Sequence, residues 1–197
     1  MMLGQIYKRG IFMKVETSTV DWSKEEMMER ARKLGFMYEQ ESHYCPQATL
    51  AALMGVFHFR DDTLFRSCFG FHGGGGDSND GACGALVAGT IAISYFFGRT
   101  RPEFDLRIEN CHATGLVKRL HEYFEEKYGG IRCRDVHKAM FGREFNVWDN
   151  KDLEEFLAMG AHEKQCPEVV GQGAAWATGI IWDELHREER IARVRIT

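Results

Sequence analysis

Proline, excess positive charge and long apolar runs are all scarce in this sequence. Proline occurs 3 times in 197 residues, which excludes a proline-rich linker or a polyproline protein. The 25 Lys and Arg residues are outnumbered by 29 Asp and Glu residues, so the net charge is −4 and the basic surface that nucleic-acid binding needs is missing. The longest apolar run, residues 86–97, is too short to span a bilayer. We therefore expect neither a nucleic-acid partner nor a membrane partner.

The N-terminal residues also lack the pattern of a secretory signal. No apolar stretch followed by a small-residue cleavage site is present there. We therefore expect a cytoplasmic protein, in a compartment where thiols stay reduced. The 6 Cys residues then indicate metal binding or redox chemistry rather than structural disulfides.

Apolar residues recur at helical spacing along most of the chain, and no convincing strand is present. Ser23 followed by Glu26 is a capping-box pattern that starts a helix. The sequence predicts an all-α bundle of about seven helices. Its glycine-rich loop, residues 70–84, precedes the most apolar and central helix, expected at 83–97. A long amphipathic helix is expected at 103–128 and a last helix at 167–189.

Four of the cysteines lie at predicted helix starts, although the chain contains no CxxC motif. Cys45 and Cys166 each precede a proline, which prefers the first turn of a helix. Cys83 follows the glycine loop, and Cys133 opens a short helix. Free N–H groups and the helix dipole at such positions favour thiolate, which is both the nucleophile and the metal ligand. We therefore expect these four cysteines to share one site.

The remaining candidates receive simpler interpretations. Cys68 lies near a helix end and Cys111 inside the long helix, and we expect both to act as small buried hydrophobic residues. Among the histidines, His72 is the one expected near the site, as a ligand or a proton donor, because it directly precedes the glycine run.

The order of cysteines and glycines resembles that of a family of redox-active proteins defined by the pattern C-GCAxxG-C-C. The matching residues are Tyr44-Cys45-Pro46-Gln47-Ala48, the glycine run 70–76, Cys83-Gly84-Ala85, residues 130–134 around Cys133, and Cys166.

The resemblance implies a helical protein in which Cys45, Cys83, Cys133 and Cys166 bind a metal or carry out redox chemistry. A similar helical domain accompanies the haems of split-Soret cytochromes, where the cysteines are associated with an iron–sulfur centre. The chain itself has no CxxCH, so covalent haem is not implied. In one departure from the pattern, Ala88 stands where the family has glycine.

On this basis we divide the chain into three parts. Residues 1–20 form an N-terminal extension, residues 21–190 a single helical four-cysteine redox domain, and residues 191–197 a C-terminal tail. An unidentified redox protein is the expected partner, and the apolar helices would also permit a homodimer.

Three functions remain open. The leading one is an iron–sulfur cluster on Cys45, Cys83, Cys133 and Cys166, used for electron transfer or redox sensing. The second is a metal-free thiol–disulfide oxidoreductase with Cys45 and Cys83 as the catalytic pair. The third is a zinc site on the same four thiols that only joins helices. Phosphate binding by residues 73–81 is disfavoured, because Asp77 and Asp80 add negative charge there.

Overall fold

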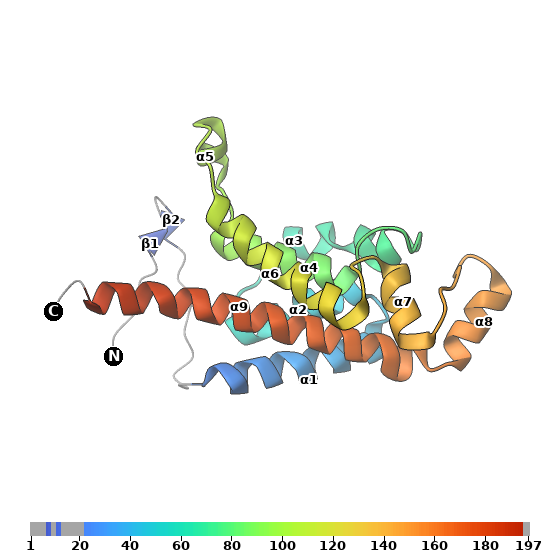
Figure 1. The fold of residues 1–197 in the computed structure, drawn as a ribbon. Helices are drawn as coiled ribbons and strands as arrows, with labels where there is room; N and C mark the ends of the chain where they lie inside the picture. Colours follow the sequence, from blue (N-terminus) through green and yellow to red (C-terminus); the bar gives the residue numbers. More distant parts are fainter. Residues whose placement is uncertain (1–6, 9–10, 13–21, 195–197) are drawn as a thin grey trace.

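The computed structural model describes residues 7–8, 11–12 and 22–194 and confirms the all-α architecture (Figure 1). The elements are β1 (Tyr7–Lys8), β2 (Ile11–Phe12), α1 (Lys24–Ser42), α2 (Cys45–Phe57), α3 (Asp62–Ser67), η1 (Phe69–Gly74), α4 (Gly84–Phe97), α5 (Arg101–Asp105), α6 (Cys111–Tyr128), α7 (Cys133–Phe141), α8 (Asn150–Ala158), η2 (Ala161–Gln165) and α9 (Cys166–Val194). The described residues therefore contain nine α-helices, where the sequence predicts about seven.

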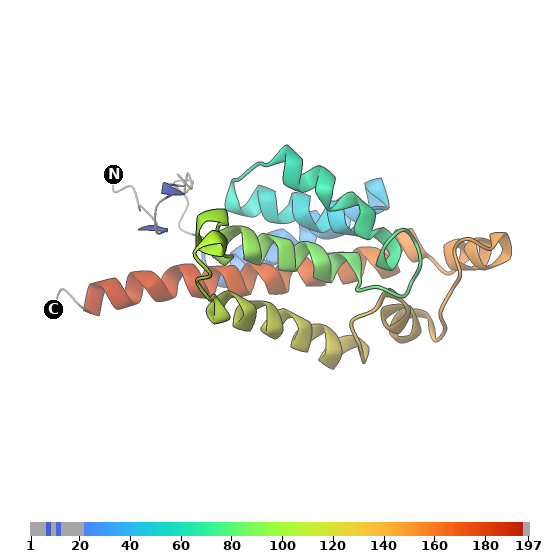
Figure 2. The ribbon, with the colours of Figure 1, turned by 90° about the horizontal axis from the view of Figure 1, so that it is seen from above.

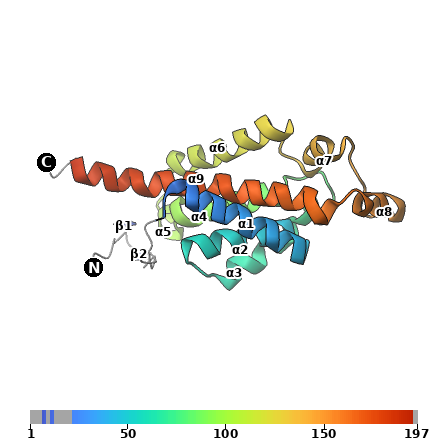
Figure 3. The same cartoon turned by 90° about the horizontal axis from the view of Figure 1, so that it is seen from below.

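The long helix α9 forms the axis of the bundle. It contacts α1, α2, α4 and α6, and Figures 2 and 3 show it running the length of the molecule between these helices. The core between them is aliphatic and aromatic, and its largest fully buried members include Leu53, Leu86, Ile93, Leu120 and Phe124. Burial of this apolar surface is the main force that holds the helices together.

Two local predictions are confirmed. The Ser23 side chain accepts the N–H of Glu26, and the Glu26 carboxylate accepts the N–H of Ser23, so the capping box at the start of α1 is complete. Helix α4 is buried on most of its surface, as its composition predicts. Ala88 is fully buried, while Gly89 is the residue whose missing Cβ makes room for Leu120 and Ala177.

The predicted helix at 103–128 is wrong as a single element. It is divided into α5 and α6, because Arg107 takes a left-handed conformation (φ 56°) and the Asn110 side chain caps α6 by accepting the N–H of Ala113. Figure 1 shows α5 projecting from the bundle as a result. The side chains of Phe104 and Leu106 are exposed on this projection.

The last helix extends beyond the end expected at residue 189. Helix α9 continues to Val194, through the point at which the C-terminal tail is expected to begin, and residues 195–197 lie outside the described part. Of the expected N-terminal extension, only the antiparallel pair β1–β2 is described. No helix in the described ranges is long and apolar enough to cross a membrane.

A second, smaller apolar cluster lies at the end of the bundle where α9 begins. Phe145, Phe156 and Ala161 are its buried members, and Cys166 packs against them. Figure 3 shows α7 and α8 gathered at this end. The same end carries the first residues of α2, α4 and α9, so it is where the cysteines meet.

Candidate functional site

Cys83 and Cys133 are brought together by their backbones. The Cys83 N–H donates to the carbonyl oxygen of Ile131 at 2.8 Å, and the Cys133 N–H donates to the carbonyl oxygen of Gly81 at 3.0 Å. The residues just before the two cysteines form an antiparallel bridge. The segments that precede α4 and α7 are therefore joined like two strands, and the two cysteines lie side by side although they are far apart in sequence.

Cys45 lies against the start of α4. A Cβ built on Gly84 would stand 2.5 Å from the Cys45 sulfur and 2.7 Å from Cδ of Pro46. Such distances are too short for real atoms, so residue 84 must be glycine for the two helix starts to approach this closely. The glycine of the Cys83-Gly84 pair is thereby explained by packing.

The environment of all four thiols is electrostatically unfavourable for thiolates. Burial raises the pKa of Cys83 to about 11 and raises the pKa of Cys45, Cys133 and Cys166 well above their usual value. Negative charge on Cys83 and on Glu39 raises the pKa of Cys45 further. Negative charge on Glu39 and on Cys133 does the same for the pKa of Cys166. The backbone bonds of Cys83 and Cys133 and the contact of Cys45 with Gly84 agree with these mutual effects.

The expected preference for thiolate at these helix starts is therefore wrong for the isolated thiols. The backbone N–H groups of Ala85 and Leu86 do lower the pKa of Cys83, as the helix-start argument requires. Desolvation is the larger effect at Cys83, which is buried together with Cys133, whereas Cys45 and Cys166 are half-buried.

Helix starts also fail to separate the site cysteines from the others. Cys111 is the first residue of α6 and is exposed, so its predicted place as a buried residue inside a helix is wrong. Cys68 is buried, and its thiol donates to the Phe65 carbonyl oxygen at 3.1 Å, which agrees with the interpretation as a small core residue. All six cysteines lie in the described part of the chain, and each is a free thiol there.

His72 lies next to the site, as predicted. Its Nδ1 is 3.8 Å from the Cys45 sulfur, and its Nε2 is 3.1 Å from Oδ1 of Asp77. Tyr44 packs against the ring at 4.7 Å between centroids. Cys45, His72 and Asp77 thus stand in the order of a nucleophile, a base and a group that orients the base.

The glycine run serves this arrangement. Gly73, Gly74, Gly75 and Gly76 all have positive φ, which turns the chain back so that Asp77 faces His72. A Cβ on Gly74 would lie 3.0 Å from Cβ of Cys133, so the loop also packs on a second cysteine.

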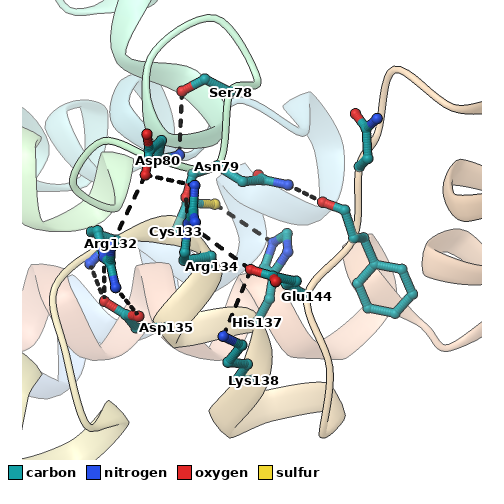
Figure 4. A network of polar contacts seen from close by, with 12 residues as sticks. Ser78, Asn79, Asp80, Arg132, Cys133, Arg134, Asp135, His137, Lys138 and Glu144 are labelled. Carbon is teal, nitrogen blue, oxygen red and sulfur yellow. Dashed lines mark hydrogen bonds and ion pairs between the residues drawn. The ribbon is translucent and has the colours of Figure 1, made fainter.

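Asn79 fixes the end of this loop to α7. Its side-chain amide donates to the Phe145 carbonyl oxygen, and its own carbonyl accepts the N–H of Arg134 at 3.0 Å. Arg134 also pairs with Asp80 at 2.5 Å. Figure 4 shows this network around Cys133, so the loop before α4 and the start of α7 form one hydrogen-bonded unit.

Three polar residues near the thiols escape the sequence analysis. His137 Nε2 lies 3.6 Å from the Cys133 sulfur, and Nδ1 of His162 lies 3.7 Å from Oε1 of Glu39. His137 follows Cys133 by four positions on α7, a spacing that places two residues on one helix face and could have revealed this histidine. His162 lies in η2, before the helix that Cys166 begins, and has no such signal. Glu39 has no such signal, because it lies on α1, which carries no cysteine.

The donor chemistry of this region suits a positively charged group. It combines four thiols with the carboxylate of Glu39, whose Oε2 is buried with no hydrogen-bond partner in the described residues. As the side chains stand, no three His, Cys, Asp or Glu residues of the described chain are arranged around a single ion. Four thiols are a ligand set that both iron–sulfur clusters and structural zinc sites use.

Comparison with known proteins agrees with the cysteine pattern. A family model described as "Putative redox-active protein (C_GCAxxG_C_C)" matches residues 43–180, which include Cys45, Cys83, Cys133 and Cys166. No curated protein and no solved structure matches the chain significantly.

Proposed function

The chain belongs to the C_GCAxxG_C_C redox-active family, and from that premise we propose that it binds an iron–sulfur cluster through Cys45, Cys83, Cys133 and Cys166. When bound, such a cluster accepts and releases single electrons, which suits electron transfer or redox sensing. Four cysteine thiolates are the usual ligand set of both [2Fe–2S] and [4Fe–4S] clusters.

One observation carries this proposal. Four thiols, two of them buried and two half-buried, lie with the Glu39 carboxylate at one end of the bundle, and a negative charge on one of these groups opposes a negative charge on the others. Bound metal ions reverse this situation, because their positive charge deprotonates coordinating thiols. The arrangement is unfavourable as a set of free thiolates and favourable as a set of metal ligands.

The surrounding backbone would tune the bound cluster. The backbone N–H groups of Ala85 and Leu86 favour negative charge on the Cys83 sulfur, and the N–H of Gly73 favours it on the Cys45 sulfur. Donors to ligand sulfurs stabilise the more negative, reduced state and raise the reduction potential. The helix starts would therefore affect the reduction potential of a bound cluster more than the reactivity of the free thiols.

Substitution of single cysteines tests the ligand assignment. Cys83→Ser should remove the visible absorption of the anaerobically reconstituted protein, and Cys111→Ser should leave it unchanged. Cys111 is a matched control, because it also begins a helix but is exposed. Loss of colour in Cys111→Ser, or its retention in Cys83→Ser, would contradict the assignment.

The contact between Cys45 and His72 favours a second candidate, metal-free thiol–disulfide exchange. His72 Nδ1 would take the thiol proton, and the Cys45 sulfur would attack a substrate disulfide and release one substrate thiol. Attack by Cys83 on the mixed disulfide would release the second thiol and leave a Cys45–Cys83 disulfide, with two electrons passed to the substrate. We rank this function second, because the raised pKa of both thiols opposes it.

A further inference from the structure

Two glutamates of the bundle are buried, and their surroundings differ. Glu184 on α9 is 4% exposed and is fully partnered, since its carboxylate lies 2.8 Å from Nε2 of His112 and 2.6 Å from an Arg187 nitrogen. Glu39 on α1 is 1% exposed, and its Oε2 has no hydrogen-bond partner within residues 22–194. Its nearest cationic candidate, Nδ1 of His162, is 3.7 Å from the other oxygen and is itself without a hydrogen bond.

A buried carboxylate without a partner is strongly unfavourable, because it loses its hydration and gains nothing in return. Natural proteins place such groups where a cation or a hydrogen-bond donor compensates them. Glu39 is therefore not explained by the packing of α1 alone. Its location suggests the compensating group, because the neighbouring His162 lies in η2, which runs directly into Cys166 at the start of α9. The Glu39 charge also raises the pKa of Cys166.

We propose that Oε2 of Glu39 is an oxygen ligand of the metal centre held by the four cysteines, and that His162 is a positioning residue on the opposite oxygen. This inference rests on the proposed metal centre and adds a donor that the cysteine pattern does not contain. Glu39 also precedes the residues 43–180 that match the family. Both orphaned atoms, Oε2 of Glu39 and Nδ1 of His162, gain a role in this arrangement.

The fifth donor changes the chemistry of the centre. Carboxylate oxygen is a harder ligand than thiolate sulfur, so Glu39 would add an oxygen donor to a set that is otherwise all sulfur.

Retention of iron by reconstituted protein tests this role. Wild type, Glu39→Gln, Glu39→Asp and Glu184→Gln are each loaded anaerobically with ferrous iron and sulfide and then titrated with a chelator. Wild type and Glu184→Gln should lose iron at the same chelator concentration. Glu39→Gln should lose it at a concentration about 10- to 100-fold lower and should show an altered electron paramagnetic resonance spectrum. Glu39→Asp keeps a shorter carboxylate and should fall between them.

The outcomes separate this inference from the proposed function. If wild type binds iron and sulfide and Glu39→Gln retains them equally well with the same spectrum, Glu39 is not a ligand, although the cysteine cluster stands. A wild-type protein that takes up neither iron nor zinc would overturn both. Circular dichroism of the metal-free variants reports folding, and if Glu39→Gln fails to fold, iron retention by Glu39→Asp decides the question.

Discussion

The sulfur of Cys45 occupies the space that a side chain at Gly84 would need, 2.5 Å from the ideal Cβ position. Cys83 and Gly84 are adjacent in sequence, so this contact also fixes the distance between two of the four site cysteines. The Cys83-Gly84 pair belongs to a sequence pattern associated with redox chemistry, but its glycine is required by packing. The glycine permits two helix starts to meet, and the meeting brings the thiols together.

Replacement of Gly84 by alanine should therefore destabilise the fold and distort the site. Overpacking of this kind costs about 1–3 kcal/mol, which lowers the melting temperature of a chain of this size by roughly 2–12 °C. Gly115 on α6 is a matched control, because nothing lies within 4 Å of the ideal Cβ position at that residue. Gly115→Ala should stabilise the helix by about 0.5–1 kcal/mol. Equal melting temperatures for the two variants in thermal unfolding would contradict this account of Gly84.

His137 should make the protein sensitive to acid. Burial lowers its pKa from 6.5 to about 4. The unfolded chain then takes up the proton first, so the stability is complete above pH 6.5 and is lost as the pH falls towards 4. At pH 5 the loss should be about 2 kcal/mol.

Thermal unfolding between pH 7 and pH 4.5 measures this effect. His137→Gln should flatten the pH dependence of the melting temperature. His137 packs against the rings of Phe141, Phe145 and Phe156, so the variant will lower the melting temperature at every pH. A slope that stays at the wild-type value in His137→Gln would show that another group titrates.

The metal-free thiols should react slowly with iodoacetamide at pH 7.5. The exposed Cys111 should be labelled first. Cys83, with its pKa raised from 9.0 to about 11, should react on the order of 100-fold more slowly than a thiol of the usual pKa. Stability should also fall above pH 9, because the unfolded chain loses its thiol protons before the folded protein does. Peptide mass spectrometry after timed labelling gives the order, and preferential labelling of Cys45 or Cys83 would favour thiol exchange instead.

Asn79 should be needed for the junction between the glycine loop and α7. Asn79→Ala removes the hydrogen bond to Phe145 and places alanine at a φ of 58°, so it should cost about 2 kcal/mol. Asn79→Gly removes the backbone strain at the positive φ but still lacks the hydrogen bond to Phe145. The difference between the two variants therefore measures the strain alone. Chemical denaturation of the three proteins measures them, and an unchanged free energy of unfolding in Asn79→Ala would contradict the role of the junction.

The fold was predictable where local chemistry decides it. The capping box at Ser23, the apolar composition of α4 and the Cys-Pro pairs at two helix starts all act within a few residues. The break between α5 and α6 was missed, because the left-handed turn at Arg107 interrupts a continuous amphipathic pattern.

The site was predictable in part, for a similar reason. Helix starts mark the candidate cysteines, yet Cys111 has the same signal and lies on the surface. Cys111 is exposed, whereas the four site cysteines are buried or half-buried, and this difference depends on how distant helices pack. The burial of Glu39 could not be predicted for the same reason. Helix α1 carries many charged residues, and its sequence does not distinguish the buried glutamate from the exposed ones.

The iron, acid-labile sulfide and zinc content of the anaerobically purified protein tests the central claim most directly. The account predicts a brown protein that contains both iron and sulfide and loses its visible absorption when Cys83 is replaced by serine. A protein that contains zinc alone would contradict the cluster and favour a site that joins helices. A colourless protein that holds no metal, even after reconstitution with iron and sulfide, would contradict any metal centre and leave thiol exchange as the function of the four cysteines.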